Sequence, residues 1–173
     1  MSAEKEKPKD KADRFISYIL SKIQSDNACA ATLKRADNPD TEYQAWEVLV
    51  PWCNLEQKRE YLPFAIIAAA IARNKPKANG THGLGTAIAR CYDDGNNSDA
   101  AKAKLRRLLA CDSIEEACQI LRPILCLIDS RGVSLDYSRL LSQLLRFGDA
   151  VRKNWAMEFF SAKEGISDVS LNA

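Results

Sequence analysis

Residues 135–160 constrain the fold most strongly, because their apolar side chains recur with the 3.6-residue period of an α-helix. Asp136 is expected to cap the first of two helices in this stretch. Gly148 is expected to end that helix in the left-handed conformation, which glycine adopts at little steric cost. One face of the helix would consist of Tyr137, Leu140, Leu141, Leu144 and Leu145, and the opposite side of Arg139, Gln143 and Arg146.

A second helix is predicted directly after the first. Its apolar stripe is made of Val151, Trp155 and Phe159, which recur every four residues. Arg152 and Lys153 point away from this stripe. Two apolar faces with cations behind them predict a helical core on one side and an anionic partner on the other.

The remainder of the sequence also favours helices. Among 173 residues, 46% are hydrophobic, while 7 glycines and 6 prolines are too few for a turn-dense all-β fold. The clearest boundary is the loop 74–83, which is rich in Gly, Pro, Asn and Lys. We therefore predict an all-α protein, either one domain with a sizeable core or two small helical subdomains that share an interface. With a boundary at this loop, two small helical bundles packed together would comprise 11–78 and 79–162, with disordered tails at 1–10 and 163–173.

Residues 56–73 form the most apolar segment. It is shorter than the about 20 uncharged residues of a membrane-spanning helix, so it is predicted to be a buried core helix. Pro63 lacks a backbone N–H, and the helix is expected to start or kink near it. Trp46 and Trp52 are interpreted as core anchors in preference to base-stacking platforms.

No enzymatic, metal or cofactor site is predicted. His82 is the single histidine, and the sequence contains no Cys-x-x-Cys pair. Gly83 and Gly85 are not preceded by a predicted strand or followed by a third glycine, which argues against a dinucleotide-binding loop. The charged N-terminus carries no apolar signal sequence, which predicts a cytoplasmic protein with reduced cysteines. The six cysteines, interpreted as small buried residues, are Cys29, Cys53, Cys91, Cys111, Cys118 and Cys126.

The net charge of +2 is too small to indicate nucleic-acid binding, so the distribution of charge matters. Residues 102–153 contain ten Lys/Arg against six Asp/Glu, a local charge of +4. The most cationic predicted helix is capped by Ser98 or Asp99. Its apolar arc carries Leu105, Leu108 and Leu109, and its basic arc carries Lys102, Lys104, Arg106 and Arg107. Such a basic arc is either a solvated helix face or a phosphate-binding surface.

A further helix is predicted from the spacing of Ser113 and Glu116, which is that of a capping box. This helix is expected to reach Ile128 with an interruption or kink at Pro123.

Several segments, in their order along the chain, resemble the CasB family, the small subunit of the type I-E CRISPR complex Cascade. These are K-L-R-R-L-L-A, L-R-P-I-L, L-D-Y-S-R-L-L-S-Q-L-L-R-F and V-R-K-N-W-A-M-E-F-F. L-K-R-A at 33–36 and G-L-G-T-A-I-A-R at 83–90 also resemble signatures of that family. The resemblance covers roughly residues 30–160.

The resemblance implies a non-catalytic, all-helical subunit of two small bundles, present in two copies in Cascade. The implied partners are the guide RNA, the target DNA, the displaced single-stranded DNA, the large and backbone subunits, and a second copy of the chain. Matching positions imply nucleic-acid-binding roles for Lys34, Arg35, Arg106, Arg107, Arg122, Arg139, Arg152 and Lys153. Lys58 and Arg59 lie where the family tends to be basic, and Lys102 and Lys104 belong to the cationic helix.

The function predicted from this resemblance is antiviral defence, in which the protein binds the phosphate backbone non-specifically and stabilises an R-loop by holding the displaced strand. The alternative that the sequence leaves open is a helical adaptor that binds only protein partners.

Overall fold

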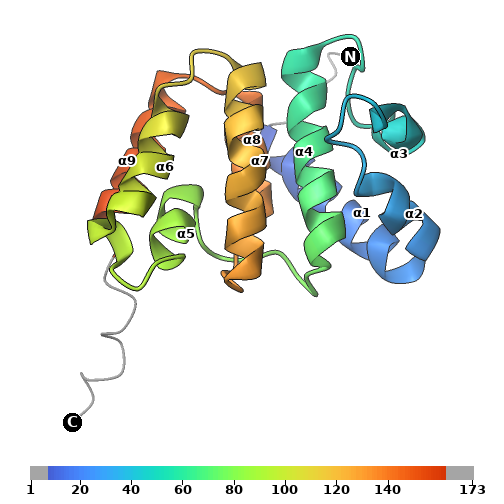
Figure 1. The fold of residues 1–173 in the computed structure, drawn as a ribbon. Helices are drawn as coiled ribbons and strands as arrows, with labels where there is room; N and C mark the ends of the chain where they lie inside the picture. The colour runs from blue at the N-terminus through green and yellow to red at the C-terminus, as the bar shows by residue number, and fades with distance from the viewer. Residues whose placement is uncertain (1–7, 163–173) are drawn as a thin grey trace. The chain divides into compact units, whose positions relative to one another are not determined.

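The computed structural model describes residues 8–162, and the regular secondary structure in this range is helical (Figure 1). This confirms the predicted all-α fold. The chain first forms α1 (Pro8–Ser25), α2 (Asn27–Leu33), the 3-10 helix η1 (Glu42–Ala45), α3 (Trp46–Leu49) and α4 (Lys58–Asn74). It continues through α5 (Leu84–Arg90), the 3-10 helix η2 (Gly95–Asn97), α6 (Asp99–Leu109), α7 (Ile114–Ser130), α8 (Tyr137–Leu145) and α9 (Asp149–Ser161).

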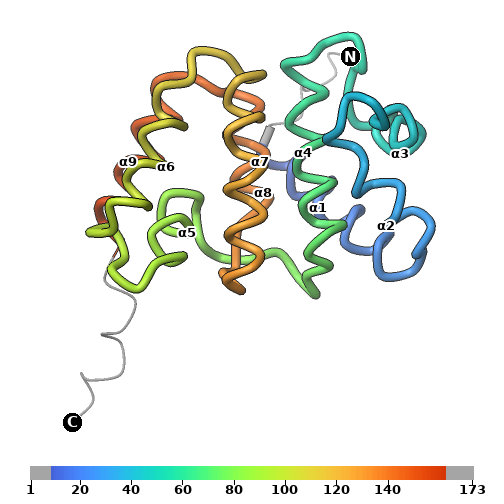
Figure 2. The backbone as a smooth tube through the Cα atoms, in the orientation of Figure 1, coloured from blue at the N-terminus to red at the C-terminus, as the bar shows by residue number. Residues whose placement is uncertain are grey.

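The contacts divide the described chain into two units that are not continuous in sequence. One contains residues 8–79 and 137–146, and the other contains 80–136 and 147–162. The expected division into bundles at 11–78 and 79–162 placed α8 in the second bundle. In the structure, α8 belongs to the first unit. Figure 2 traces the backbone through these helices in the same orientation as Figure 1.

Specific hydrogen bonds hold α8 in the first unit. The Asn74 side chain donates to the Tyr137 hydroxyl at 3.1 Å. The Tyr137 backbone N–H donates to Asn79 Oδ1 at 2.8 Å, which satisfies one of the free N–H groups at the start of α8. The Ser138 hydroxyl donates to the carboxylate of Asp13 on α1.

The tail boundaries also differ from expectation. Since α1 begins at Pro8, the expected disordered segment 1–10 is wrong for residues 8–10. The disorder expected for residues 1–7 and 163–173 lies outside the described residues.

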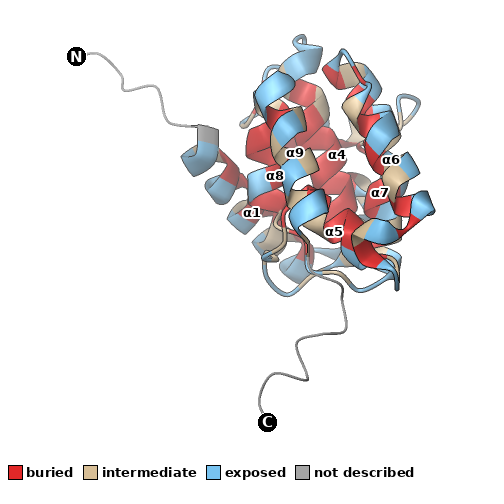
Figure 3. Ribbon diagram, turned by 90° about the vertical axis from the view of Figure 1, so that its left-hand side faces the viewer, coloured by how far each residue is buried: buried red, intermediate tan, exposed pale blue. Residues whose placement is uncertain are grey.

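The core of the first unit is built on α4, which is buried over most of its length (Figure 3). The helix starts at Lys58 and runs through Pro63, so a start near Pro63 is wrong. Phe15 of α1 meets Phe64 edge-on, with ring centroids 4.8 Å apart, and meets Trp52 at 5.3 Å. Trp52 therefore packs against the core as expected.

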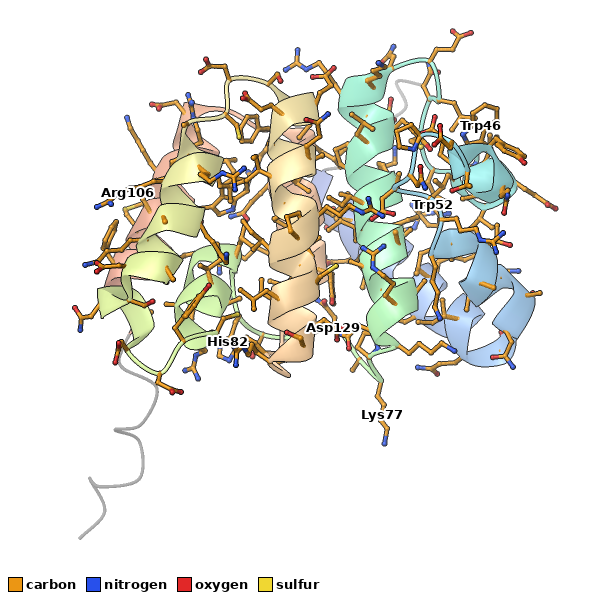
Figure 4. All side chains as sticks on the ribbon, in the orientation of Figure 1. Trp46, Trp52, Lys77, His82, Arg106 and Asp129 are labelled. Atoms are coloured by element: carbon orange, nitrogen blue, oxygen red, sulfur yellow. The ribbon has the colours of Figure 1, made fainter. Side chains whose placement is uncertain are left out.

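Trp46 is not a core anchor. Its exposed fraction is 40%, and it meets the 58% exposed Tyr43 edge-on. Figure 4 shows Trp46 on the short helix α3. The interpretation of Trp46 as buried is wrong, because α3 ends after a single turn and leaves one side of this ring uncovered.

The core of the second unit contains the predicted stripe of α9. Val151, Trp155 and Phe159 are all buried, as their four-residue spacing predicted. Helix α5 packs closely against α9 at Gly85, where an added Cβ would lie 2.1 Å from the Trp155 carbonyl oxygen. The two glycines at 83 and 85 thus permit close helix packing.

Several local expectations are confirmed and others corrected. Ser98 accepts the Ala101 N–H, and Ser113 accepts the Glu116 N–H, each at 3.2 Å, which confirms both caps. The return bond of the capping box reaches one residue further back, from the Asp112 N–H to Glu116 Oε2 at 3.2 Å. Gly148 has φ 173°, an extended conformation, so a left-handed stop is wrong there.

The structure also contradicts two expectations about burial. Gln143, expected on the polar side of α8, is 3% exposed. All six cysteines are free thiols. Cys53, Cys91, Cys111 and Cys118 are buried as expected, whereas Cys29 is half-buried and Cys126 is exposed.

Within residues 8–162, no helix combines the length and the apolar character that a bilayer crossing requires.

Candidate nucleic-acid interface

The basic arc of α6 is held on a rigid helix. Ser98 caps its start, and Leu105 and Leu108 are buried on its inner face. On the other side, Arg106 and Arg107 are exposed and Lys102 and Lys104 are half-buried. The Arg106 side chain extends outward from α6 in Figure 4. The helix therefore presents four cations that the core cannot cover.

None of these four α6 cations has a carboxylate within ion-pair distance among residues 8–162. Arg106 and Arg107 lie in the last turn, where a cation is favourable because the helix dipole is negative there. That effect is worth only a few tenths of a kcal/mol to about 1 kcal/mol per cation. It does not account for Lys102 and Lys104 further back. The arc is thus a concentration of positive charge that the described chain does not neutralise.

Arg152 is engaged within the second unit. Its Nη1 donates to the Cys111 carbonyl at 3.0 Å and lies 3.5 Å from the Leu109 carbonyl. These carbonyls belong to the end of α6 and the turn after it, which lack helical partners. Asp112 and Asp149 lie 3.7 and 3.8 Å from the guanidinium. The side chain is 27% exposed, so Arg152 already serves to hold the end of α6.

Lys153 is exposed but paired. Its Nζ lies 2.9 Å from Asp149 Oδ2, one helical turn away. The hydrogen bond from Lys153 and its charge lower the pKa of the Asp149 carboxyl. A phosphate that binds Lys153 would have to compete with this carboxylate.

In the first unit, Lys34 and Arg35 are exposed just after α2. Arg35 Nη1 donates to Gln44 Oε1 at 2.9 Å, which fixes the guanidinium beside η1. Lys58 and Arg59 are exposed in the first turn of α4. A cation is unfavourable at a helix N-terminus, so local helix stability does not explain these two residues.

The two remaining predicted residues, Arg122 on α7 and Arg139 on α8, are exposed as well. The predicted set therefore falls into both units. The first unit carries Lys34, Arg35, Lys58, Arg59 and Arg139, and the second carries Lys102, Lys104, Arg106, Arg107, Arg122, Arg152 and Lys153.

A groove in the second unit brings two of these cations together with apolar side chains. It has a volume of about 240 Å³ and lies where α6 packs against α7. Its lining residues are Tyr92, Lys104, Arg107, Ile120, Pro123, Ile124 and Leu127. Of these, only Lys104 and Arg107 were in the predicted set.

Two further residues of the second unit, Tyr92 of this groove and Arg131, were not predicted from the sequence. Tyr92 follows α5 in a turn, outside any helical periodicity. Arg131 caps the end of α7. Burial raises the pKa of the Cys91 thiol to about 11, against the opposing charges of Arg131 and Lys104. Both cations therefore act near the end of α5, a relation that no spacing in the sequence reveals.

The described residues contain no group of three or more His, Cys, Asp and Glu side chains that could hold a metal ion. The backbone of His82 is paired, since its N–H donates to the Ser134 carbonyl at 3.0 Å and its carbonyl accepts from the Asp136 N–H at 2.8 Å. Burial and the charge of Arg90 both lower the pKa of the His82 imidazole. These contacts place His82 in the scaffold of the second unit.

The family model of the CRISPR-associated protein Cse2 matches residues 30–160, which is most of the chain. The chain belongs to the Cse2 family. This confirms the family resemblance of the segments that run from L-K-R-A to the end of α9. No curated protein sequence is significantly similar to this Cse2 protein.

Two solved structures share the fold of this Cse2 protein. One is a chain of a CRISPR RNA-guided surveillance complex, with a TM-score of 0.72, 20% identity, and coverage of 88% of this chain and 93% of that chain. The other is CasB from Thermobifida fusca, with a TM-score of 0.64, 20% identity, and coverage of 88% and 97%. At this identity the likeness concerns the fold.

Proposed function

We propose that this Cse2 protein is a non-catalytic subunit of a CRISPR RNA-guided surveillance complex and that it binds nucleic acid through the phosphate backbone. The observation that carries the proposal is the arc on α6, where Lys102, Lys104, Arg106 and Arg107 have no carboxylate partner among the described residues. The likeness in fold to a chain of such a complex supports the assembly.

The chemistry of this arc suits a partner recognised without regard to sequence. Lysine and arginine bind phosphate through charge and N–H donors, and these contacts read no base edges. In a guide-directed complex, base pairing between guide and target reads the sequence, so a subunit has only to recognise backbone. The guide RNA and target strand, together with the displaced strand of an R-loop, are the proposed ligands.

The energetic demand on the subunit is small. Forming an R-loop exchanges one duplex for another of similar stability, so modest contacts to the displaced strand can shift the balance. Phosphate contacts act largely by releasing counterions, and four contacts to a single strand give a slope of log K against log salt of about −3. We propose that holding the displaced strand is the contribution of this protein to antiviral defence.

The proposed protein partners are the large and backbone subunits and a second copy of the chain. One observation favours a protein-binding surface. Tyr43, Trp46 and Val50 are 58%, 40% and 56% exposed around α3 in the first unit. Tyrosine and tryptophan are enriched among the residues that dominate protein interfaces. A purely protein-binding adaptor is the second candidate function on this ground.

Fluorescence anisotropy of labelled single-stranded DNA, single-stranded RNA and duplex DNA tests the proposal. Arg106→Glu with Arg107→Glu reverses two exposed charges of the α6 arc. Lys9→Glu with Lys77→Glu reverses two exposed charges outside the proposed site and changes the net charge equally. We expect the α6 pair to weaken binding at low salt strongly and the control pair to leave it nearly unchanged. If a folded protein binds no nucleic acid, or if both pairs weaken binding equally, the α6 arc is not the ligand-binding surface.

A further inference from the structure

The groove between α6 and α7 has an apolar floor and a cationic rim. Ile124 is buried, and Ile120 and Leu127 are half-buried beside it. Lys104 and Arg107 project from successive turns of α6, and no carboxylate is among the lining residues. A cavity of about 240 Å³ is smaller than the about 300–1,000 Å³ sites of drug-sized ligands. Its size suits one planar ring system.

Two residues give the groove flat surfaces. Tyr92 lines the groove, and its backbone is held by two hydrogen bonds, from its own N–H to the Ala89 carbonyl at 3.3 Å and from the Gly95 N–H to its carbonyl at 3.0 Å. Pro123 lies in the interior of α7 with its ring exposed. Proline weakens a helix interior because it removes a hydrogen bond, and an exposed ring gains no core packing in return. Helix stability and packing therefore do not explain Pro123.

We propose that this groove binds one unstacked nucleobase of a single strand, with the adjacent phosphates on Lys104 and Arg107. The proposal rests on the proposed function, because it names the form of nucleic acid that the α6 arc takes. Aromatic and apolar surfaces bind the face of any base, so the contact is tolerant of sequence.

This geometry predicts a preference for single strands. In a duplex, both faces of each base are covered by its neighbours, and only an unstacked base can enter an apolar groove. Duplex DNA would reach the phosphate-binding cations alone. A displaced strand in an R-loop has the free bases that the groove requires.

The test compares a single strand of about 12 nucleotides, a length within the range of known single-strand sites, with an abasic strand of equal length. The abasic strand keeps every phosphate but presents no base. Anisotropy with the full chain should show the ordinary strand binding about tenfold more tightly, as expected for loss of one stacked base. Duplex DNA should bind about as weakly as the abasic strand.

Three variants test whether the difference in affinity between the ordinary and the abasic strand arises from the groove. Tyr92→Ala and Pro123→Ala should each weaken binding of the ordinary strand several-fold and leave the abasic strand unchanged. Tyr43→Ala removes an exposed aromatic ring in the other unit. It should leave the affinity for the ordinary strand and for the abasic strand unchanged. Pro123→Ala restores a helical N–H, so the protein should become more stable while it binds the base less well. A loss of binding through unfolding would give the opposite change in stability.

The outcomes separate the two proposals. If ordinary and abasic strands bind equally and both depend on Arg107, phosphate binding stands and the base-binding groove is wrong. If Tyr92→Ala weakens both strands alike, the ring supports the fold and does not contact a base. If no strand binds a folded protein at low salt, both proposals fail, and an acidic protein segment becomes the better occupant of the groove.

Discussion

At Gly85, the backbone of α9 lies too close to α5 to admit a side chain. An added Cβ would lie 2.1 Å from the Trp155 carbonyl oxygen and 2.7 Å from the Phe159 nitrogen. The Gly85 N–H also donates to Glu158 Oε2 at 3.0 Å. Because the obstacles are backbone atoms, they can give way only if one of the two helices moves.

Gly85→Ala is therefore expected to lower the free energy of unfolding by about 3 kcal/mol, as overpacking of a tight contact does. Gly132→Ala is the matched control. Gly132 has φ +66° and open space around it, so its substitution should cost only the left-handed backbone strain of about 1 kcal/mol. Urea unfolding followed by circular dichroism measures both. Equal losses would show that close packing at Gly85 is unimportant.

Arg152 illustrates how a residue predicted to contact phosphate acquires a structural role. Its guanidinium donates to carbonyls at the end of α6 from a position on α9. Arg152→Ala should lower the free energy of unfolding by about 2 kcal/mol, because a charged donor to otherwise free carbonyls is lost. Lys153→Ala removes an exposed ion pair and should cost about 0.5 kcal/mol or less. A larger loss from Lys153→Ala than from Arg152→Ala would contradict these roles.

At the scale of helices, α4 carries two cations where its dipole disfavours them. Lys58 and Arg59 occupy the first turn, and the Gln57 side chain makes no capping hydrogen bond. Two cations in this position lower the stability of the helix. A phosphate contact would explain why they are present. The N-terminus of a helix also favours an anion through its dipole.

Lys58→Glu with Arg59→Glu should consequently stabilise the protein by about 1 kcal/mol, since each carboxylate now complements the helix dipole. If these cations contact phosphate, the same change should weaken nucleic-acid binding. Thermal unfolding and anisotropy, measured on the same preparation, should move in opposite directions. Stabilisation without any loss of binding would remove Lys58 and Arg59 from the proposed site.

Across the whole molecule, the features that can be predicted from the sequence are those that depend on residues close together along one helix. The spacing of Val151, Trp155 and Phe159 is sufficient to predict a buried stripe, because each lies one turn from the next. The caps at Ser98 and Ser113 are local in the same way. The exposure of Arg106 and Arg107 also follows from their positions opposite Leu105 and Leu108.

Features that depend on residues distant in sequence could not be predicted. The membership of α8 in the first unit depends on contacts such as that between Asn74 and Tyr137, 63 residues apart. The same limit applies to the site. The carbonyl partners of Arg152 lie more than 40 residues away, and the groove joins Tyr92 to side chains of α6 and α7. Helical periodicity carries no information about such pairs.

The most direct test of the central claim is the salt dependence of single-strand binding by the full chain, with and without Arg106→Glu and Arg107→Glu. If the α6 arc neutralises about four phosphates, log K should fall with log salt at a slope of about −3, and the double variant should reduce it to about −1.5 or shallower. A slope near zero, or a steep slope that the variant leaves unchanged, would contradict phosphate binding by α6.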